Sequence, residues 1–172
     1  MPWFRTLAAL GLLTPLLVAC DDDDDSNAPA TGFVATLTGS GEVPPVQTTA
    51  AGSAALTISG DAITYTVNVT NIENAVVAHI HIAPLGQNGP VRLNLCGTGA
   101  PVPPCTSGTG VLATGTNGVT VGDPPITFDS LVSAMRAGNT YVNVHTDDGV
   151  APPNTGQGDM ASGEIRGQIT AE

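Results

Sequence analysis

Three histidines are the residues of this sequence whose type and spacing could do chemistry. His79 and His81 stand two positions apart within residues 76–83, an apolar segment with the composition of a β-strand. Because side chains alternate between the two faces of a strand, both imidazoles are expected on one face. His145 lies near the end of a second such segment, residues 140–146. If these two strands are neighbours in a sheet, the three imidazoles converge.

Neutral imidazoles are ligands that copper and zinc accept, and the affinity order among divalent ions favours Cu(II). A His-x-His pair followed by a late third histidine is similar in geometry to the copper half of the Cu/Zn superoxide dismutase sandwich. The chain has no further histidine to bridge a second metal, and only a short turn separates His81 from Val91. Dismutase chemistry is therefore not expected, and the sequence indicates a binding protein rather than an enzyme.

Two interpretations of the histidines follow. In the first, His79, His81 and His145 hold a copper ion with an open or weakly ligated position, and binding weakens below about pH 6.5 as the imidazoles are protonated. In the second, the imidazoles are structural. They then hydrogen-bond to neighbouring loops, such as the one at Asp147 or the one at Glu42.

Other polar residues give weaker signals. Asp147, Asp148 and Asp159 lie in a Gly- and Pro-rich loop, but their spacing fits no EF-hand, which favours solvated acids over a calcium site. Glu164 and Arg166 share one face of the last expected strand and are expected to pair with each other or across the sheet. The sequence contains no Gly-x-Ser-x-Gly elbow and no phosphate-binding glycine loop followed by lysine.

Composition restricts both the fold and the partners. The chain has 172 residues, with 4 Lys+Arg, 15 Asp+Glu and a net charge of −11, which excludes a protein that binds nucleic acid by neutralising phosphates. Aromatic residues make up only 3%, so the core must consist of Val, Ile, Leu and Ala. The 21 glycines and 14 prolines favour short strands joined by turns.

The N-terminus has the pattern of a targeting segment. Arg5 precedes an apolar run that is too short to span a membrane, and the run ends in Leu-Val-Ala-Cys at Cys20. This ending resembles the bacterial lipobox. The resemblance implies a lipoprotein signal peptide over residues 1–19, cleavage before Cys20, and acylation of that cysteine. The alternative is an ordinary secretory signal followed by a chance cysteine.

Residues 20–32 are expected to form an acidic, disordered tether. Asp21–Asp25 is a run of carboxylates with no fixed backbone geometry, so it is expected to be solvated rather than to form a cation site. Together with acylation at Cys20, the tether predicts a protein anchored by lipid on the periplasmic or cell-surface side of a bacterial membrane.

The remainder of the chain predicts an all-β domain. Apolar and polar residues alternate with the period of a strand, turns separate the segments, and a single helical pattern lies near residues 130–137. Strands are expected over residues 33–38, 52–59, 62–70, 76–83, 91–95, 109–114, 119–121, 140–146 and 163–170. This number of short strands predicts an antiparallel Greek-key β-sandwich, either superoxide-dismutase-like or immunoglobulin-like.

Several motifs in this region resemble the CHRD domain, a family first described in the developmental protein chordin. The motifs follow the family order: LTGSGEVPPV at 37–46, AHIH at 78–81, GPV at 89–91, YVNVHT at 141–146 and GEIRGQI at 163–169. The resemblance assigns residues 33–172 to one CHRD domain. It implies an extracytoplasmic all-β binding or structural module and does not identify its ligand, which we expect to be a protein or a metal.

Cys96 and Cys105 remain after Cys20 is assigned to lipid. An even pair of cysteines in an oxidising compartment predicts a disulfide, which would restrict the proline-rich loop between them. The alternative is a pair of thiolate metal ligands, but no histidine stands near them in the sequence.

Overall fold

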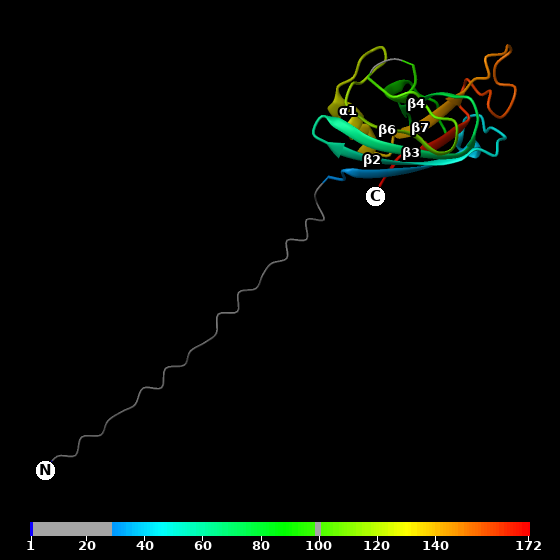
Figure 1. The fold of residues 1–172 in the computed structure, drawn as a ribbon. Helices are drawn as coiled ribbons and strands as arrows, with labels where there is room; N and C mark the ends of the chain where they lie inside the picture. Colours follow the sequence, from blue (N-terminus) through cyan, green and yellow to red (C-terminus); the bar gives the residue numbers. More distant parts are fainter. Residues whose placement is uncertain (2–28, 99–100) are drawn as a thin grey trace.

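The computed structural model describes Met1, residues 29–98 and residues 101–172 (Figure 1). The predicted signal peptide beyond Met1, the acylation site at Cys20 and most of the acidic tether lie outside these residues. Within them, no helix combines the length and the apolar character needed to cross a membrane.

The described residues form a nine-stranded sheet with one short α-helix. A 3-10 turn at Gly39–Gly41 follows the first strand, and helix α1 spans Phe128–Arg136. The strands are β1 (Gly32–Thr38), β2 (Ala51–Ser59), β3 (Ala62–Ile72), β4 (Ala75–Ile82), β5 (Val91–Cys96), β6 (Gly108–Asn117), β7 (Thr140–Thr146), β8 (Ile165–Gln168) and β9 (Thr170–Ala171).

The strand order is β5-β4-β7-β8-β1-β2-β3-β6, with β9 beside β1, and all pairings are antiparallel. The two ends of this order approach each other: the Asn117 side-chain amide donates to the Asn94 carbonyl at 2.9 Å, and Leu93 forms a bridge with Thr120. The sheet therefore curls into a nearly closed sandwich (Figure 1). The predicted all-β Greek-key class is confirmed.

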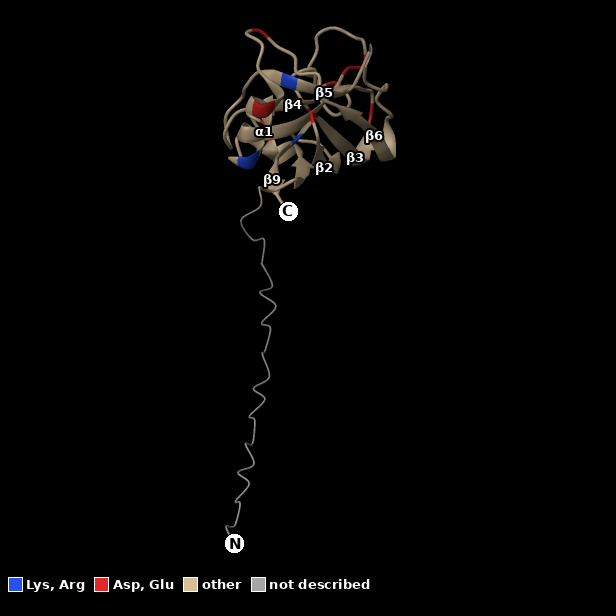
Figure 2. Ribbon diagram, turned by 90° about the vertical axis from the view of Figure 1, so that its left-hand side faces the viewer, with Lys and Arg blue, Asp and Glu red and all other residues tan. Residues whose placement is uncertain are grey.

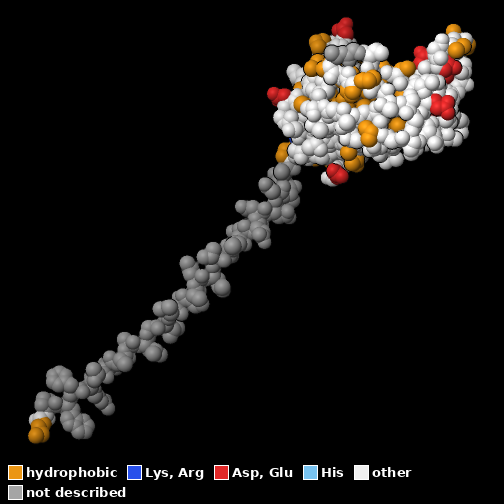
Figure 3. Space-filling view, viewed as in Figure 1, with side chains coloured by type: hydrophobic (Ala, Val, Ile, Leu, Met, Phe, Trp, Pro, Cys, Tyr) orange, Lys and Arg blue, Asp and Glu red, His pale blue; other side chains and the backbone are white. Residues whose placement is uncertain are grey.

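Alternation of apolar and polar residues builds the core. In β3, Ile63, Tyr65, Val67 and Val69 are buried, while the intervening polar residues face outward. As the composition requires, aliphatic side chains dominate the core, and the Tyr65 hydroxyl donates to the Leu95 carbonyl at 2.6 Å. Figure 3 shows that only scattered apolar atoms reach the surface on the face it presents.

Helix α1 confirms the single helical prediction. The Thr127 side chain accepts from the Ser130 amide at 3.1 Å and caps the helix, Asp129 lies in the first turn and Arg136 in the last. Leu131 and Met135 are buried, so the helix packs its apolar side on the core.

Two expected strands differ in the structure. Residues 119–121 form no strand, because the Asn117 side chain accepts from the Val119 amide at 2.9 Å and turns the chain at the end of β6. The strand expected over 163–170 is divided into β8 and β9, because the Ile169 amide still donates to the β7 residue Thr140 while the next residues pair with β1.

Cys96 and Cys105 form a disulfide, as the first interpretation of this pair predicted. The bond joins the end of β5 to the loop before β6, nine positions further along the chain. Both cysteines are consequently unavailable as thiolate metal ligands in this structure.

Candidate metal centre

The histidines lie on adjacent strands. Strands β4 and β7 are hydrogen-bonded neighbours, so the condition for convergence is met. The register places His81 opposite Tyr141 and His79 opposite Asn143, with His145 two positions further along β7. The intervening residues of both strands pack into the core, which leaves the imidazoles on the outer face of the sheet.

The three imidazoles form one cluster, here called the three-histidine centre. Ring centroids are 5.2 Å apart for His79 and His145, 5.7 Å for His79 and His81, and 5.9 Å for His81 and His145. One nitrogen of each ring lies within 4.8 Å of the other two. His81 is buried and the other two rings are half-buried, so the cluster is largely withdrawn from solvent.

One nitrogen of each ring is buried without a hydrogen-bond partner among the described residues. These atoms are His79 Nδ1, His81 Nε2 and His145 Nε2. Unpartnered buried polar atoms are uncommon in native structures because each carries a desolvation cost that nothing offsets. Three of them in one cluster are available to contact a further group, such as a metal ion.

Backbone carbonyls determine the tautomers of two of the rings. His81 Nδ1 lies 2.9 Å from the Gly89 carbonyl oxygen, and His145 Nδ1 lies 3.0 Å from the Ala161 carbonyl oxygen. A carbonyl can only accept, so each Nδ1 carries the proton and each Nε2 presents its lone pair to the centre. Carbonyl bonds of this kind orient the histidine ligands of protein metal sites.

The loop at residues 84–90 is shaped to hold one of these carbonyls. A Cβ atom at Gly89 would collide with the Ile82 carbonyl oxygen, so no other residue fits there without a shift of the backbone. The Gly89 amide also donates to the Tyr141 hydroxyl at 3.1 Å. This explains physically why the segment Gly89-Pro90-Val91 carries a glycine.

Burial keeps the imidazoles neutral. Desolvation, assisted by the neighbouring imidazoles, lowers the pKa of His79 to about 4. Desolvation also lowers the pKa of His81 to about 4, despite the opposing hydrogen bond to Gly89, and it lowers the pKa of His145. Neutral imidazole is the form that binds a metal, so the proton competition expected below pH 6.5 begins at a lower pH in the folded protein.

Tyr141 and Arg166 form a stack beside the centre. The Tyr141 ring stacks on the His81 ring, with centroids 4.7 Å apart. The guanidinium carbon of Arg166 lies 3.4 Å from the centroid of the same Tyr141 ring. Arg166 also donates to the Asn88 side-chain oxygen at 3.0 Å and to the Gln87 carbonyl at 2.7 Å. The stack therefore fastens the 84–90 loop against the sheet.

The expected ion pair between Glu164 and Arg166 does not form. Glu164 is fully buried and instead accepts from the Thr48 hydroxyl at 2.6 Å, the Thr146 hydroxyl at 2.7 Å and the Gly158 amide at 2.9 Å. These donors satisfy the carboxylate without a cation, and they join the loop after β7 to the segment before β2.

Glu42 lies near the centre without taking part in it. The side chain is 5% exposed and borders a cavity of about 280 Å³ together with Met160 and Gly163. Burial raises the pKa of the Glu42 carboxyl to about 7, although the charge of Arg166 and the amide of Asn143 act in the opposite direction. None of the three histidines lines this cavity.

The sequence indicates the three histidines as ligand candidates but not the side chains and carbonyls that contact them. Tyr141, Asn143 and Arg166 have the strand spacing that places them on the histidine face, and this spacing was the available signal. Nothing local in the sequence shows that the carbonyls of Gly89 and Ala161 meet histidine rings. That contact depends on how two loops fold back over the sheet.

The fold, the disulfide and the motif positions can be compared with known families. Residues 33–169 match the CHRD domain. The chain belongs to the CHRD domain family. Comparison with curated proteins gives no match.

In this CHRD domain the three histidines and Arg166 all fall inside the matched range. Membership supports a module of the extracytoplasmic type that binds a partner or serves a structural role. The acylation site at Cys20 lies outside the residues that the structure describes.

Proposed function

We propose that this protein is a lipid-anchored, extracytoplasmic CHRD module whose three-histidine centre binds one copper ion. The observation that carries the proposal is the cluster of His79, His81 and His145: each ring has one buried nitrogen without a hydrogen-bond partner among the described residues, and one ligand nitrogen of each ring lies within 4.8 Å of the other two. We propose copper as the cofactor. We propose the membrane as the partner, which the protein contacts through acylated Cys20.

A purely structural role accounts for the cluster less well. Gly89 and Ala161 satisfy one nitrogen of His81 and one of His145, and a structural role would stop there. The Nε2 atoms of His81 and His145 and the Nδ1 atom of His79 remain buried without a partner among the described residues, which is unfavourable until a further group contacts them. A metal ion satisfies all three nitrogens at once.

The dimensions of the centre suit a small transition metal. Metal–nitrogen bonds of 2.0–2.1 Å place tetrahedrally arranged imidazole nitrogens about 3.3 Å apart. The nitrogens here lie within 4.8 Å of each other, so they would have to approach one another by at most about 1.5 Å to close the site. All-imidazole ligation and the affinity order among divalent ions favour copper over zinc.

Three protein ligands leave a position for water or another small ligand. The sequence has no histidine beyond these three that could bridge a second metal ion at this centre, so we propose copper binding or delivery and no turnover. Copper would supply a Lewis-acidic, redox-active centre when bound. The residues of this chain hold it, orient its ligands through Gly89 and Ala161, and exclude bulk water.

Titration with Cu(II) tests the proposal. Wild-type mature protein is compared with His79→Gln/His81→Gln/His145→Gln, and Asn68→Gln, an exposed change on β3, serves as the matched control. The Asp21–Asp25 run is present in all three proteins, so its weak binding cancels. We expect one equivalent of tightly bound copper with nitrogen hyperfine structure in its electron paramagnetic resonance spectrum, in wild type and control alone.

The opposite result is equally clear. If wild-type protein binds copper no more tightly than the triple variant, the copper proposal is wrong and the histidines are structural. The CHRD assignment would be unaffected by that outcome, because it rests on the match over residues 33–169.

A further inference from the structure

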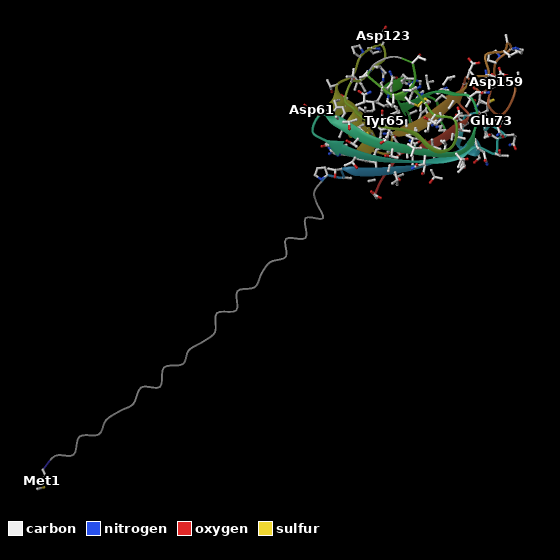
Figure 4. All side chains as sticks on the ribbon, in the orientation of Figure 1. Met1, Asp61, Tyr65, Glu73, Asp123 and Asp159 are labelled. Carbon is white, nitrogen blue, oxygen red and sulfur yellow. A yellow bond between two sulfur atoms is a disulfide. The ribbon has the colours of Figure 1, made fainter. Side chains whose placement is uncertain are left out.

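A second cluster of ligand atoms lies in the loop between β7 and β8, apart from the three-histidine centre. One carboxylate oxygen each of Asp147, Asp148 and Asp159 lies within 4.8 Å of the other two. Asp147 and Asp148 are exposed, whereas Asp159 is only 3% exposed. Figure 4 shows Asp159 beside this loop, at the opposite end of the sheet from Asp61.

The buried member of the cluster has one oxygen unaccounted for. Asp159 Oδ2 accepts from the Thr155 amide at 2.9 Å and from the Thr155 hydroxyl at 2.6 Å. Its Oδ1 is also buried but has no hydrogen-bond partner within the described part of the chain.

No basic side chain compensates the cluster. The three described arginines, Arg92, Arg136 and Arg166, each donate to groups in other parts of the fold. Glu73 adds to the negative charge, because its side chain lies against Gly158, the residue before Asp159. Figure 2 shows the same imbalance, with acidic positions around the loops and few basic ones.

We propose that Asp147, Asp148 and Asp159 bind a calcium ion. The ion would be coordinated by the unpartnered Asp159 oxygen and by one oxygen from each of the two exposed aspartates. Asp147 Oδ1 accepts from the Gly149 amide at 2.7 Å, and Asp148 Oδ1 accepts from the Val150 amide at 2.8 Å. An all-oxygen site on a loop, with water completing the shell, has the chemistry that Ca²⁺ prefers. The rigid octahedron of Mg²⁺ suits it less well.

The calcium site would stabilise the loop that reaches the three-histidine centre. The same loop carries Ala161, whose carbonyl oxygen holds His145. An ion at Asp159 would cross-link the start of the loop to its middle and so restrict the segment that reaches the three-histidine centre. Calcium binding at this site does not require copper binding, because the two clusters share no ligand atom.

The melting temperature of the metal-free mature protein in EGTA and in 5 mM CaCl₂ tests the proposal. Extracellular calcium modules have dissociation constants of about 0.1–1 mM, and a tenfold excess over the dissociation constant raises the melting temperature of a domain this size by about 4–6 °C. We expect that rise in wild type and in Asp61→Asn, an exposed change in a distant turn. We expect it to be lost in Asp148→Asn and Asp159→Asn.

Each result has a definite meaning. An equal melting temperature in EGTA and CaCl₂ for wild type overturns the site, and so does a full calcium response in Asp148→Asn. Because Asp148 is exposed, its variant decides the question even if Asp159→Asn does not fold. A rise of the same size with MgCl₂ would show non-specific screening of the acidic loop and would also overturn the site.

Discussion

His145 Nδ1 lies 3.0 Å from the carbonyl oxygen of Ala161, so a loop that follows β7 by many residues returns to fix the tautomer of a residue at the end of that strand. The Gly89 carbonyl does the same for His81 from the other side of the centre. Two loops thus leave the Nε2 atoms of His81 and His145 as the hydrogen-bond acceptors of their rings.

The first prediction concerns Gly89. Gly89→Ala forces a Cβ against the Ile82 carbonyl oxygen and moves the carbonyl that holds His81. We expect copper affinity to fall about 10–100-fold, the usual cost of losing an outer hydrogen bond to a ligand. Gly86→Ala is the matched control for loop strain, since it lies in the same loop and its φ of +78° disfavours alanine, while its Cβ meets nothing within 4 Å. Equal losses in both variants would mean that loop strain alone is responsible.

The second prediction concerns the disulfide. Removing it with Cys96→Ala/Cys105→Ala frees the loop between β5 and β6 in the unfolded chain, which costs about 2–3 kcal/mol of stability for a loop this short. For this size of domain we expect the melting temperature to drop by about 5–12 °C. Thiol titration of native protein should find no free thiol from this pair, and two alkylatable thiols would contradict the bond.

The third prediction concerns Glu42. Its folded-state pKa of about 7 lies above the unfolded value of 4.5, so its stabilising contribution is complete below pH 4.5 and is lost as pH rises through 7. Glu42→Gln stays neutral, and it should exceed wild type in unfolding free energy at pH 8, by up to about 3 kcal/mol. At pH 4.5 the two should be equal. Denaturant unfolding at both pH values measures this, and no gain at pH 8 would refute it.

The fourth prediction concerns the histidines without metal. His79 and His81 have folded-state pKa values of about 4, below the ordinary 6.5. The folded state therefore binds fewer protons than the unfolded state, so stability is present above pH 6.5 and is lost as pH falls toward 4. In a Glu42→Gln background, which removes the opposing titration, His79→Gln/His81→Gln should flatten the stability profile over this interval. A profile that keeps its slope would place the titration elsewhere.

The fifth prediction concerns anchoring. If Cys20 is acylated, Cys20→Ser should release the protein to the soluble fraction or leave it unprocessed, because acyl chains supply the membrane affinity. Mass spectrometry and detergent partitioning report the change. Identical mass and partitioning in wild type and variant, apart from the substitution itself, would end the lipoprotein proposal.

The sequence predicted most of the fold because the relevant signals are local. Alternation in Ile63–Val69 determines which side of β3 is buried, and Asp129 in the first turn with Arg136 in the last indicates the helix. The division between β8 and β9 was not predictable, because it depends on a change of pairing partner at Ile169 rather than on any residue preference.

The candidate site, like the fold, could be predicted only where the signal is local in the sequence. The shared face of His79 and His81 follows from strand periodicity, whereas the approach of His145 required the pairing of β4 with β7. Of the two alternatives for Glu164 and Arg166, pairing with each other does not occur. Both side chains instead contact residues of the neighbouring strand β7, Glu164 through the Thr146 hydroxyl and Arg166 through the Tyr141 ring. Long-range contacts decided both outcomes, and a single sequence does not contain them.

The approach of β5 and β6 at the ends of the strand order has a consequence for neighbouring copies of the protein. These are the two edge strands of the sheet, and each turns its free edge toward the other, at Leu93 and Asn94 on one side and Asn117 and Thr120 on the other. Exposed edges are templates on which a second chain can add a strand. If acylation of Cys20 concentrates the protein on a membrane, its copies would meet often, and this arrangement would let them lie close together without exchanging strands.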